Sequence, residues 1–316
     1  MVELSVIIVS YNTADALRAC LDSLTHSISA LCISAEIIIV DNASTDGSLA
    51  AARQAAPDAR LITNSANVGY ARAANQGARA ATGWALLFLN PDTIVNTVAI
   101  RECFRALKDQ RVAAVAPVLL NTDGSLQRSW HSFPTLKRAI LDVFLPVGAF
   151  GIIRRALMTA PPSDPEWIIG AFLMIRRDAF DTVGPFSERT FMYSEDMDWC
   201  HRARLAGFSI RLLRSCSITH HGGAAARRHY SGLERDIAAE AATDLWMGRS
   251  RVWELCRLAT QELVLGTMIS LLLPSGATKY RRALDRRRAA RTYYWRVLNA
   301  RVARKRRCLT TRSSSV

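Results

Sequence analysis

The sequence lacks the glycine-rich loops that hold phosphate in many nucleotide-dependent enzymes. Neither G-x-G-x-x-G nor G-x-x-x-x-G-K-[ST] follows the first predicted strand, "LSVIIVS" at residues 4–10. This absence argues against a dinucleotide-dependent enzyme and against a P-loop ATPase. A diphosphate bound by this chain would need another partner for its charge, and a divalent cation held by a carboxylate would serve.

Cysteine pairs and long apolar runs are also missing. No two of the 7 cysteines form a C-x-x-C pair, and an odd, scattered set indicates reduced thiols in a cytoplasm. The first residues, "MVELSVIIVSYN", open directly as a strand, so we expect no export signal. The most apolar segment, at 263–274, is shorter than the roughly 20 residues that span a bilayer, but it could lie in the membrane interface.

Charge of both signs is present but unevenly distributed. The 316 residues carry a formal net charge of +14, and residues 225–316 contain 20 Lys and Arg against 7 Asp and Glu. Residues 1–224 are therefore nearly neutral. This asymmetry predicts a globular domain at 1–224 and a basic extension at 225–316, which would meet either nucleic acid or an anionic membrane.

Half of the residues are hydrophobic, and in the first part of the chain they form short apolar runs that alternate with helical patterns. This rhythm predicts a Rossmann-like α/β domain with a mainly parallel sheet and right-handed crossovers. Residues 136–165 show little periodicity and are predicted to form a loop over the site. Strands are expected at 4–10, 36–40, 59–63, 84–90 and 112–120, and helices near 14–26, 47–55, 69–81 and 97–108.

Polar residues gather where the predicted strands end. "SYN" follows the first strand, "DNASTDGS" at 41–48 belongs to the end of the second, and "NPDT" at 90–93 follows the apolar run "LLFL". Carboxyl ends of parallel strands meet at one edge of the sheet, where open α/β sheets bind ligands. Asp92 is therefore a candidate metal ligand.

Each of these motifs, taken alone, also fits a turn or a helix cap. Asp46 or Ser44 could cap the helix after the second strand, and Asp92 or Thr93 could cap the helix after the fourth. The acidic run "SEDMD" at 194–198 would favour the start of a helix capped by Ser194. The conjunction of the motifs along one α/β chain is harder to attribute to capping.

Six blocks in this order resemble the family 2 glycosyltransferases of the GT-A fold, and within them the branch of bacterial rhamnosyltransferases that act in polysaccharide assembly. Together they cover about residues 3–224. The blocks are "LSVIIVSYNTADALRACLDSL", "IIIVDNASTDGS", "NVGYARAANQGARAATG", "LLFLNPDT", "GAFLMIRRDAFDTVGPFSERTFMYSEDMDWCHRARLAGF" and "ITHHGG".

The resemblance implies an inverting transferase that uses a nucleotide-diphosphate sugar and a divalent metal, Mg²⁺ or Mn²⁺. Asp92 matches the last aspartate of the family's metal-binding D-x-D, while Asn90 replaces the first. His220 matches a histidine that some relatives supply to the metal, and Asp196 matches the catalytic base. The residues implied to line the nucleotide-sugar cleft are Tyr11, Asn12, Asp41, Asn42, Asn67, Gly69, Asn75 and Asn90.

Inverting transfer is a single displacement, which needs one base for the acceptor hydroxyl and one electrophile for the leaving diphosphate. A glycosidase would use two carboxylates flanking the bond. Burial beside apolar neighbours and a second carboxylate would raise the pKa of Asp196. Spacing alone leaves Glu195, Asp196 and Asp198 open as the base, and Asp196 rests on the resemblance.

The tail combines an apolar segment at 263–273 with polybasic helical patterns, which suits an interfacial helix on an anionic membrane. No nucleic-acid module accompanies it, so no nucleic acid is expected as a partner. We therefore predict a cytoplasmic enzyme, peripheral on the inner face of the cytoplasmic membrane. It would move rhamnose from dTDP-rhamnose to a lipid-linked saccharide. A UDP-hexose, GDP-mannose or UDP-galactofuranose donor, or a non-catalytic nucleotide-sugar-binding protein, is the alternative.

Overall fold

The structure is a computed structural model that describes residues 2–133 and 161–222, with a few further positions between 259 and 292. The chain divides into two compact units, and the first comprises Met1–Phe133 and Ala160–Arg235. The predicted loop at 136–165 lies mostly outside the described residues. So does nearly all of the predicted basic extension, and the domain boundary at residue 224 stays a prediction.

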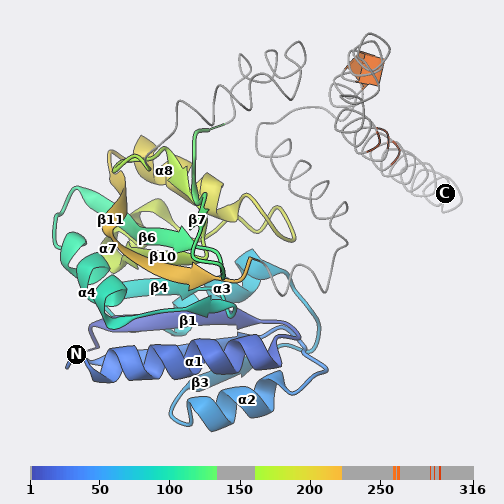
Figure 1. The fold of residues 1–316 in the computed structure, drawn as a ribbon, viewed down its shortest axis with the longest axis vertical. Coiled ribbons are helices and arrows are strands. Elements are labelled where there is room, and N and C mark those ends of the chain that lie inside the picture. Colours follow the sequence, from blue (N-terminus) through green and yellow to red (C-terminus); the bar gives the residue numbers. More distant parts are fainter. Residues whose placement is uncertain are drawn as a thin grey trace, which may run out of the picture. The chain divides into compact units, whose positions relative to one another are not determined.

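The described part of this unit alternates strands and helices along its first half (Figure 1). Its elements are β1 (Leu4–Ser10), α1 (Ala14–Ser29), β2 (Ala35–Asp41), α2 (Ser48–Ala55), β3 (Arg60–Thr63), α3 (Tyr70–Ala80), β4 (Ala85–Leu89), β5 (Thr93–Ile94), α4 (Thr97–Ala106), β6 (Val112–Leu120), β7 (Leu126–Gln127), β8 (Trp130–His131), β9 (Trp167–Ile168), β10 (Phe172–Arg176), α7 (Arg177–Val183), α8 (Glu195–Leu205) and β11 (Ser209–His220). The strands and helices predicted for the first 120 residues are confirmed to within a few residues at each end.

A mostly parallel sheet forms the centre, with the strand order β3-β2-β1-β4-β10-β6-β11-β5. β1 pairs in parallel with both β2 and β4, so the direction of strand addition reverses between β1 and β4. Such a switch point leaves a crevice outside the carboxyl ends of the strands. β10 runs antiparallel between β4 and β6, which the alternation of runs in the sequence did not predict.

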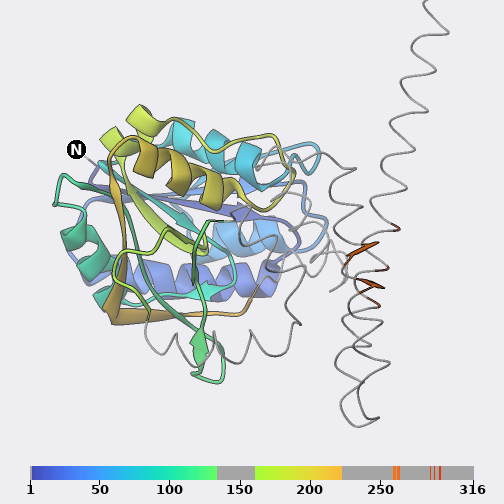
Figure 2. The same ribbon diagram turned by 90° about the horizontal axis from the view of Figure 1, so that it is seen from above.

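Helices cover both faces of the sheet, as Figure 2 shows. Along β4, Leu87 and Leu89 pack with α1, α2 and α4 on one face, and Leu86 and Phe88 pack with α3, α7 and α8 on the other. A strand buried on both faces needs apolar residues at every position, which explains the unbroken run "ALLFL". The two apolar layers fix the strands, and hence the loops at their ends.

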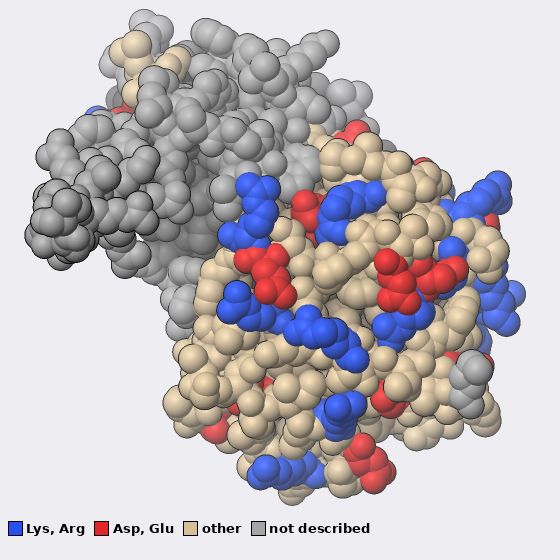
Figure 3. Space-filling model, turned by 180° about the vertical axis from the view of Figure 1, so that it is seen from behind, with Lys and Arg blue, Asp and Glu red and all other residues tan. Residues whose placement is uncertain are grey.

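The surface of the domain carries both signs of charge. On the face shown in Figure 3, basic and acidic side chains of the described residues are interspersed. This agrees with the near neutrality of residues 1–224 in the sequence. Within the described ranges, no helix combines the length and the apolar character that crossing a membrane requires.

Candidate functional site

The loops after β1 and β2 hold each other through side chains. The Asn12 Oδ1 atom accepts hydrogen bonds from the amides of Thr45 (2.7 Å) and Asp46 (3.3 Å). In return, Ser44 Oγ accepts from the Asn12 amide at 2.9 Å. Asn12 has a φ of 52°, a left-handed conformation that asparagine tolerates better than most residues. The side-chain oxygen of Asn12 is thus used to shape the loop, and Tyr11 lies half-buried beside it.

The capping alternative is right in part, because Gly47 is the N-cap of α2 and Asp46 binds the helix from the preceding position. Its Oδ1 atom accepts from the Ser48 amide at 2.9 Å, where α2 begins. Its Oδ2 atom accepts from the Ala14 amide at 3.1 Å, where α1 begins. One carboxylate therefore satisfies the first amide of each helix, which locks the two loops in one arrangement.

Asp41, at the carboxyl end of β2, is placed differently. It is only 3% exposed, and its Oδ2 atom accepts from the Ser44 amide at 3.0 Å. Its Oδ1 atom is buried and has no hydrogen-bond partner among the described residues. A buried carboxylate oxygen without a partner is costly, so this atom is a candidate to receive a hydrogen bond from a ligand.

Asn42 and Asn67 converge on Gly69. The side chain of Asn42 makes two hydrogen bonds. Its Nδ2 atom donates to the Gly69 carbonyl (3.2 Å), and its Oδ1 atom accepts from Asn64 Nδ2 (2.9 Å). Asn67 Oδ1 accepts from the Gly69 amide at 3.1 Å. These three predicted cleft residues are brought together, but the hydrogen bonds of both side chains serve to hold the turn before α3.

Asn75 is turned away from these residues. Its side chain accepts from the Phe186 amide (3.0 Å) and donates to the Phe186 carbonyl (2.9 Å) and to Glu188 Oε1 (3.0 Å). Arg72 also contacts Glu188, at 3.2 Å. Asn75, 1% exposed, therefore fastens the segment before α8 to α3, and a nucleotide contact for it stays a prediction.

Asp92 and His220 lie together at the other side of the switch point. β5 pairs with the end of β11, so that His220 is opposite Thr93, and His220 Nε2 lies 3.3 Å from Asp92 Oδ1. Both residues are buried, at 3% and 7% exposure. Neither Asp92 nor Thr93 caps α4, because Asn96 does so by accepting from the Ala99 amide at 2.9 Å. That capping alternative was wrong.

Gln127 fixes which ring nitrogen of His220 carries a proton. The Gln127 amide group donates to Asn121 Oδ1 (2.9 Å) and to the His220 carbonyl (3.4 Å), so its Oε1 atom is the acceptor 2.7 Å from His220 Nδ1. Nδ1 must then carry the hydrogen in the neutral ring, and Nε2 presents a lone pair to Asp92. Nε2 is buried and makes no hydrogen bond to a described residue.

A lone pair facing a carboxylate oxygen fits a divalent cation between them. Two ligands bound at about 2.1 Å and at a right angle lie roughly 3 Å apart, close to the 3.3 Å found here. Imidazole nitrogen and carboxylate oxygen are both ligands of such ions. The described residues contain no group of three side chains that could ligate a metal.

Asn90 lies directly after β4 and two residues before Asp92. Its amide donates to the Ala171 carbonyl at 2.9 Å, and its own carbonyl accepts from Thr93 Oγ1 at 2.8 Å. The main chain of Asn90 thereby ties the Asp92 loop to the strand pair β4–β10. The residue before Ala171 is Gly170, whose amide contacts one of the acidic residues at the start of α8.

The acids at the start of α8 have three different environments. Asp196 Oδ2 accepts from the Gly170 amide at 2.9 Å, and Oδ1 accepts from the Met197 amide at 2.8 Å. Because Gly170 precedes the Ala171–Asn90 contact, Asp196 lies at the same edge of the sheet as Asp92. Asp198 instead pairs with Arg202 at 2.8 Å, and Arg202 binds main-chain carbonyls. Asp198 is thus engaged in holding the helix.

Burial raises the pKa of both remaining acids. For Asp196 the cause is desolvation, which outweighs the hydrogen bonds from main-chain amides, and the direction agrees with the prediction. For Glu195, desolvation and the neighbouring Asp196 raise the pKa to about 8. Glu195 is 9% exposed, and its Oε2 atom has no hydrogen-bond partner among the described residues.

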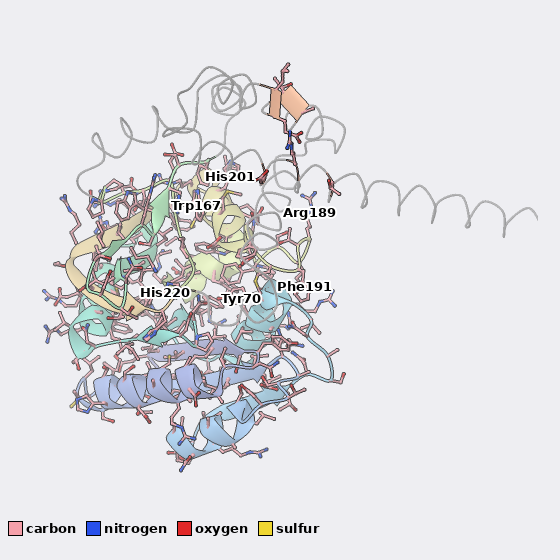
Figure 4. All side chains as sticks on the ribbon, turned by 45° about the vertical axis from the view of Figure 1, so that its right-hand side comes forward. Tyr70, Trp167, Arg189, Phe191, His201 and His220 are labelled. Atoms are coloured by element: carbon pink, nitrogen blue, oxygen red, sulfur yellow. The ribbon has the colours of Figure 1, made fainter. Side chains whose placement is uncertain are left out.

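Three residues of this site were not singled out from the sequence. Gln127 lies on a two-residue strand, and nothing in its neighbourhood signals that it will orient a histidine. Gly170 acts through its main-chain amide, which every residue type except proline possesses. Burial raises the pKa of the Tyr70 hydroxyl, and the nearby Glu195 and Asp196 raise it further. Figure 4 shows Tyr70 and Phe191 close together, and His220 on β11.

Ser194 was expected to cap α8, and this is only partly right. It occupies the N-cap position, but its φ is 69° and its side chain makes no capping hydrogen bond. Tyr193 also has a positive φ, of 74°. Two successive left-handed residues turn the chain sharply just before the acids, a conformation that is found more often at functional sites than elsewhere.

The fold is that of the GT-A glycosyltransferases. A mannosyltransferase from Pyrobaculum calidifontis, solved with GDP-Man and Mn²⁺, superimposes with a TM-score of 0.58 over 92% of this chain and 85% of its own, at 17% sequence identity. S. aureus TarS superimposes with a TM-score of 0.51 over 96% of this chain and 92% of the solved chain, at 16% identity. At such identities the likeness concerns the fold.

The sequence comparison is more specific. Residues 5–184 match the model of glycosyl transferase family 2, and the chain belongs to that family. The N-acetylglucosaminyl-diphospho-decaprenol L-rhamnosyltransferase of Mycobacterium tuberculosis is 32% identical over 223 residues, which cover 65% of this chain and 70% of the relative. The low-salt glycan biosynthesis hexosyltransferase Agl10 of Haloferax volcanii is 28% identical over 69% of this chain and 67% of its own. The family and the enzyme class predicted from the sequence are confirmed.

Proposed function

We propose that this glycosyltransferase moves rhamnose, with inversion, from dTDP-rhamnose to a lipid-linked saccharide in cell-envelope polysaccharide assembly. The Mycobacterium tuberculosis relative is an N-acetylglucosaminyl-diphospho-decaprenol L-rhamnosyltransferase, which supports both the sugar and the acceptor class. The observation that carries the chemistry is the position of Asp196. The Gly170 amide holds it at the sheet edge where Asn90 and Asp92 lie.

In the proposed reaction, Asp196 accepts the proton of an acceptor hydroxyl while that oxygen bonds to the anomeric carbon, and the bond from this carbon to the diphosphate breaks. The two main-chain amides on Asp196 fix the direction of its oxygens. Burial keeps its proton affinity above that of an exposed aspartate, which favours proton uptake. Because Asp198 is paired with Arg202, it is a poorer candidate for this role.

On the donor side, Asp92 and His220 would hold Mg²⁺ or Mn²⁺, and the bound cation would neutralise the leaving diphosphate. The lone pair that Gln127 imposes on His220 Nε2 supports this assignment. Asp41 Oδ1 is suited to accept a hydrogen bond from the N–H group of a nucleobase. Tyr11, Asn12, Asn42, Asn67 and Gly69 would line the same pocket, the last four through the loops that they hold.

The donor is tested with a panel of nucleotide sugars. Melting temperature is measured with dTDP-rhamnose, UDP-glucose, GDP-mannose and UDP-galactofuranose, with and without Mn²⁺, because a ligand of the native state raises it. Transfer from each to a polyprenyl-diphosphate-linked N-acetylglucosamine is then followed. We expect a Mn²⁺-dependent shift and transfer with dTDP-rhamnose. If only another donor were turned over, the choice of sugar would be overturned. If a nucleotide sugar bound but no transfer occurred, the protein would be a non-catalytic nucleotide-sugar-binding protein.

We also propose that residues beyond about 251 hold the enzyme on anionic membrane, because an apolar segment at 263–273 stands next to polybasic sequence. Each basic side chain near an anionic leaflet contributes about 1 kcal/mol, which salt weakens. Cosedimentation with anionic vesicles should therefore fall partly with salt for the full chain, and should be lost in a chain ending near residue 248. Equal sedimentation of the two chains, or retention by nucleic acid but not by vesicles, would overturn the proposal.

A further inference from the structure

Gly69 lies where two distant segments of the domain cross. Its φ is +88°, and a Cβ atom added there would be 2.4 Å from the Phe191 carbonyl oxygen and 3.2 Å from the Phe191 carbonyl carbon. Real Cβ atoms essentially never approach a main-chain oxygen so closely, so only glycine allows this crossing. Figure 4 shows Phe191 next to Tyr70, the residue that follows Gly69.

A hydrogen bond closes the same crossing. The Tyr70 amide, the first of α3, donates to the Phe191 carbonyl at 3.0 Å. Two asparagine side chains hold Gly69 itself. The Gly69 carbonyl accepts from Asn42 Nδ2, and the Gly69 amide donates to Asn67 Oδ1. One residue is thus fixed to the end of β2, to the turn before α3 and to the segment before α8.

The segment on the far side of the crossing carries the candidate base. Phe191 is followed by the left-handed residues Tyr193 and Ser194, and α8 then begins with Glu195 and Asp196. Upstream, Asn75 fastens Phe186 and Glu188 to α3. Between Glu188 and the acids, the hydrogen bond from the Tyr70 amide to the Phe191 carbonyl links the main chain of this segment to α3.

We propose that Gly69 is a positioning residue that acts through Phe191 to fix the distance between the donor-binding half of the site and Asp196. The inference rests on the proposed function, since it assigns the two halves their roles. It differs from the role that the resemblance implies for Gly69, which is a contact to the nucleotide. A side chain at residue 69 would push Phe191 outward, and Asp196 lies five residues further along.

The test is Gly69→Ala, with two matched glycine variants. Gly207→Ala meets the same φ of +88° but finds nothing within 4 Å, so it reports the cost of the backbone conformation alone. Gly83→Ala meets main-chain crowding, with the Ser5 amide nitrogen at 2.6 Å, but lies at the amino end of the sheet. Both controls should lower the melting temperature and leave kcat unchanged.

For Gly69→Ala we expect kcat to fall about 100-fold, the order of loss that a displacement of about 1 Å can cause. The affinity for the nucleoside diphosphate of the donor, measured by calorimetry with Mn²⁺, should stay within a few-fold of the wild-type value. A loss of affinity that accounts for the whole loss of transfer would make Gly69 a nucleotide contact and overturn the proposal. An unchanged kcat would overturn it too.

Should Gly69→Ala fail to fold, Tyr70→Pro and Tyr70→Ala replace it. Both lose the phenol, but only proline loses the amide that binds Phe191. Proline is well tolerated at the first position of a helix, and the ψ of 165° at Gly69 is compatible with a following proline. We expect kcat about tenfold lower for Tyr70→Pro than for Tyr70→Ala at equal nucleotide affinity. Equal kcat values would overturn the proposal. A wild-type chain that turns over no donor would instead refute the proposed function.

Discussion

The two ends of the same parallel sheet treat their polar groups in opposite ways. At the amino end, Glu36 accepts hydrogen bonds from Ser5 Oγ (2.6 Å), from the Thr82 amide (2.7 Å) and from Thr82 Oγ1 (2.8 Å). Ser5 Oγ in turn accepts from the Gly83 amide at 2.8 Å. Desolvation by itself would raise the pKa of Glu36, but the hydrogen bonds from Ser5 and Thr82 together outweigh it and lower the pKa. This end of the sheet satisfies its own polar atoms.

The carboxyl end leaves polar atoms buried without hydrogen-bond partners among the described residues. These atoms are Asp41 Oδ1, Glu195 Oε2 and His220 Nε2. Each lies on a residue that is less than one-tenth exposed, so water does not readily compensate. The comparison teaches that a folded domain can tolerate this cost where a ligand would offset it, whereas the described residues at the opposite end include no such atoms.

The largest effect expected at the carboxyl end is on chemistry. Asp196→Asn should lower kcat by roughly three orders of magnitude and keep donor binding, because general-base removal typically costs between 10² and 10⁴. Single-turnover transfer and calorimetry measure the two quantities. Asp198→Asn, on the same helix but paired with Arg202, is the control and should keep kcat close to wild type. If Glu195→Gln caused the larger loss instead, the base would be Glu195.

The next effect is on metal-dependent binding. Asp92→Ala should abolish the Mn²⁺-dependent part of nucleoside diphosphate binding, since it removes the carboxylate ligand. Gln127→Leu should weaken it by about 10- to 100-fold, because His220 would lose the partner that fixes its tautomer. Calorimetry with and without Mn²⁺ measures both. Unchanged Mn²⁺-dependent binding in Asp92→Ala would refute the metal site, and Glu36→Gln should leave binding intact.

The smallest expected effect is on stability. The change of stability with pH should have one sign for Glu195, at the carboxyl end of the sheet, and the opposite sign for Glu36, at the amino end. The pKa of Glu195 is raised from 4.5 to about 8, so between these values the folded chain keeps a proton that the unfolded chain has lost. Rising pH therefore destabilises the fold in this window, by at most about 1.4 kcal/mol per pH unit. Glu195→Gln should match wild type near pH 5 and be the more stable protein near pH 8.

Glu36 should behave in the opposite way. Its pKa is lowered, so its contribution to stability is present above the unfolded value of 4.5 and is lost as pH falls below it. Glu36→Gln should therefore be less stable than wild type near neutral pH, by about 1 kcal/mol, and the difference should shrink on acidification. Urea unfolding at several pH values measures both variants. For each variant, the difference in unfolding free energy from wild type is plotted against pH. If the two differences changed with pH in the same direction, the proposed contrast between the two ends of the sheet would be refuted.

The sequence predicts the strand-based features of the site better than the contacts between distant loops. Asp41 and Asp92 could be predicted because each follows a buried strand, and parallel strands end at one edge. The roles of Gly170 and Gln127 could not, because they depend on which segments the fold brings into contact. Asn12 and Asn75 illustrate the same limit, since a polar residue in a motif can serve a ligand or the loops themselves.

β10 illustrates this limit for the fold. Its run "FLMIR" predicts a buried strand, but not that it enters the sheet antiparallel between β4 and β6. The register and direction of β10 depend on which strand edges of the sheet are still unpaired when β10 is added to it. That information lies in the whole chain and not in the segment.

The place of β10 also has a consequence for the nascent chain on the ribosome. β4 pairs with β1 on one side and with β10 on the other, so its second edge stays open until residues 172–176 have been synthesised. At about 5–20 residues per second, the delay after Leu89 is about 4 to 17 s. During it, a wholly apolar strand exposes an unpaired edge, a template for association with other chains. Chaperone binding should therefore concentrate in this interval of translation, and prematurely terminated chains that end before β10 should aggregate.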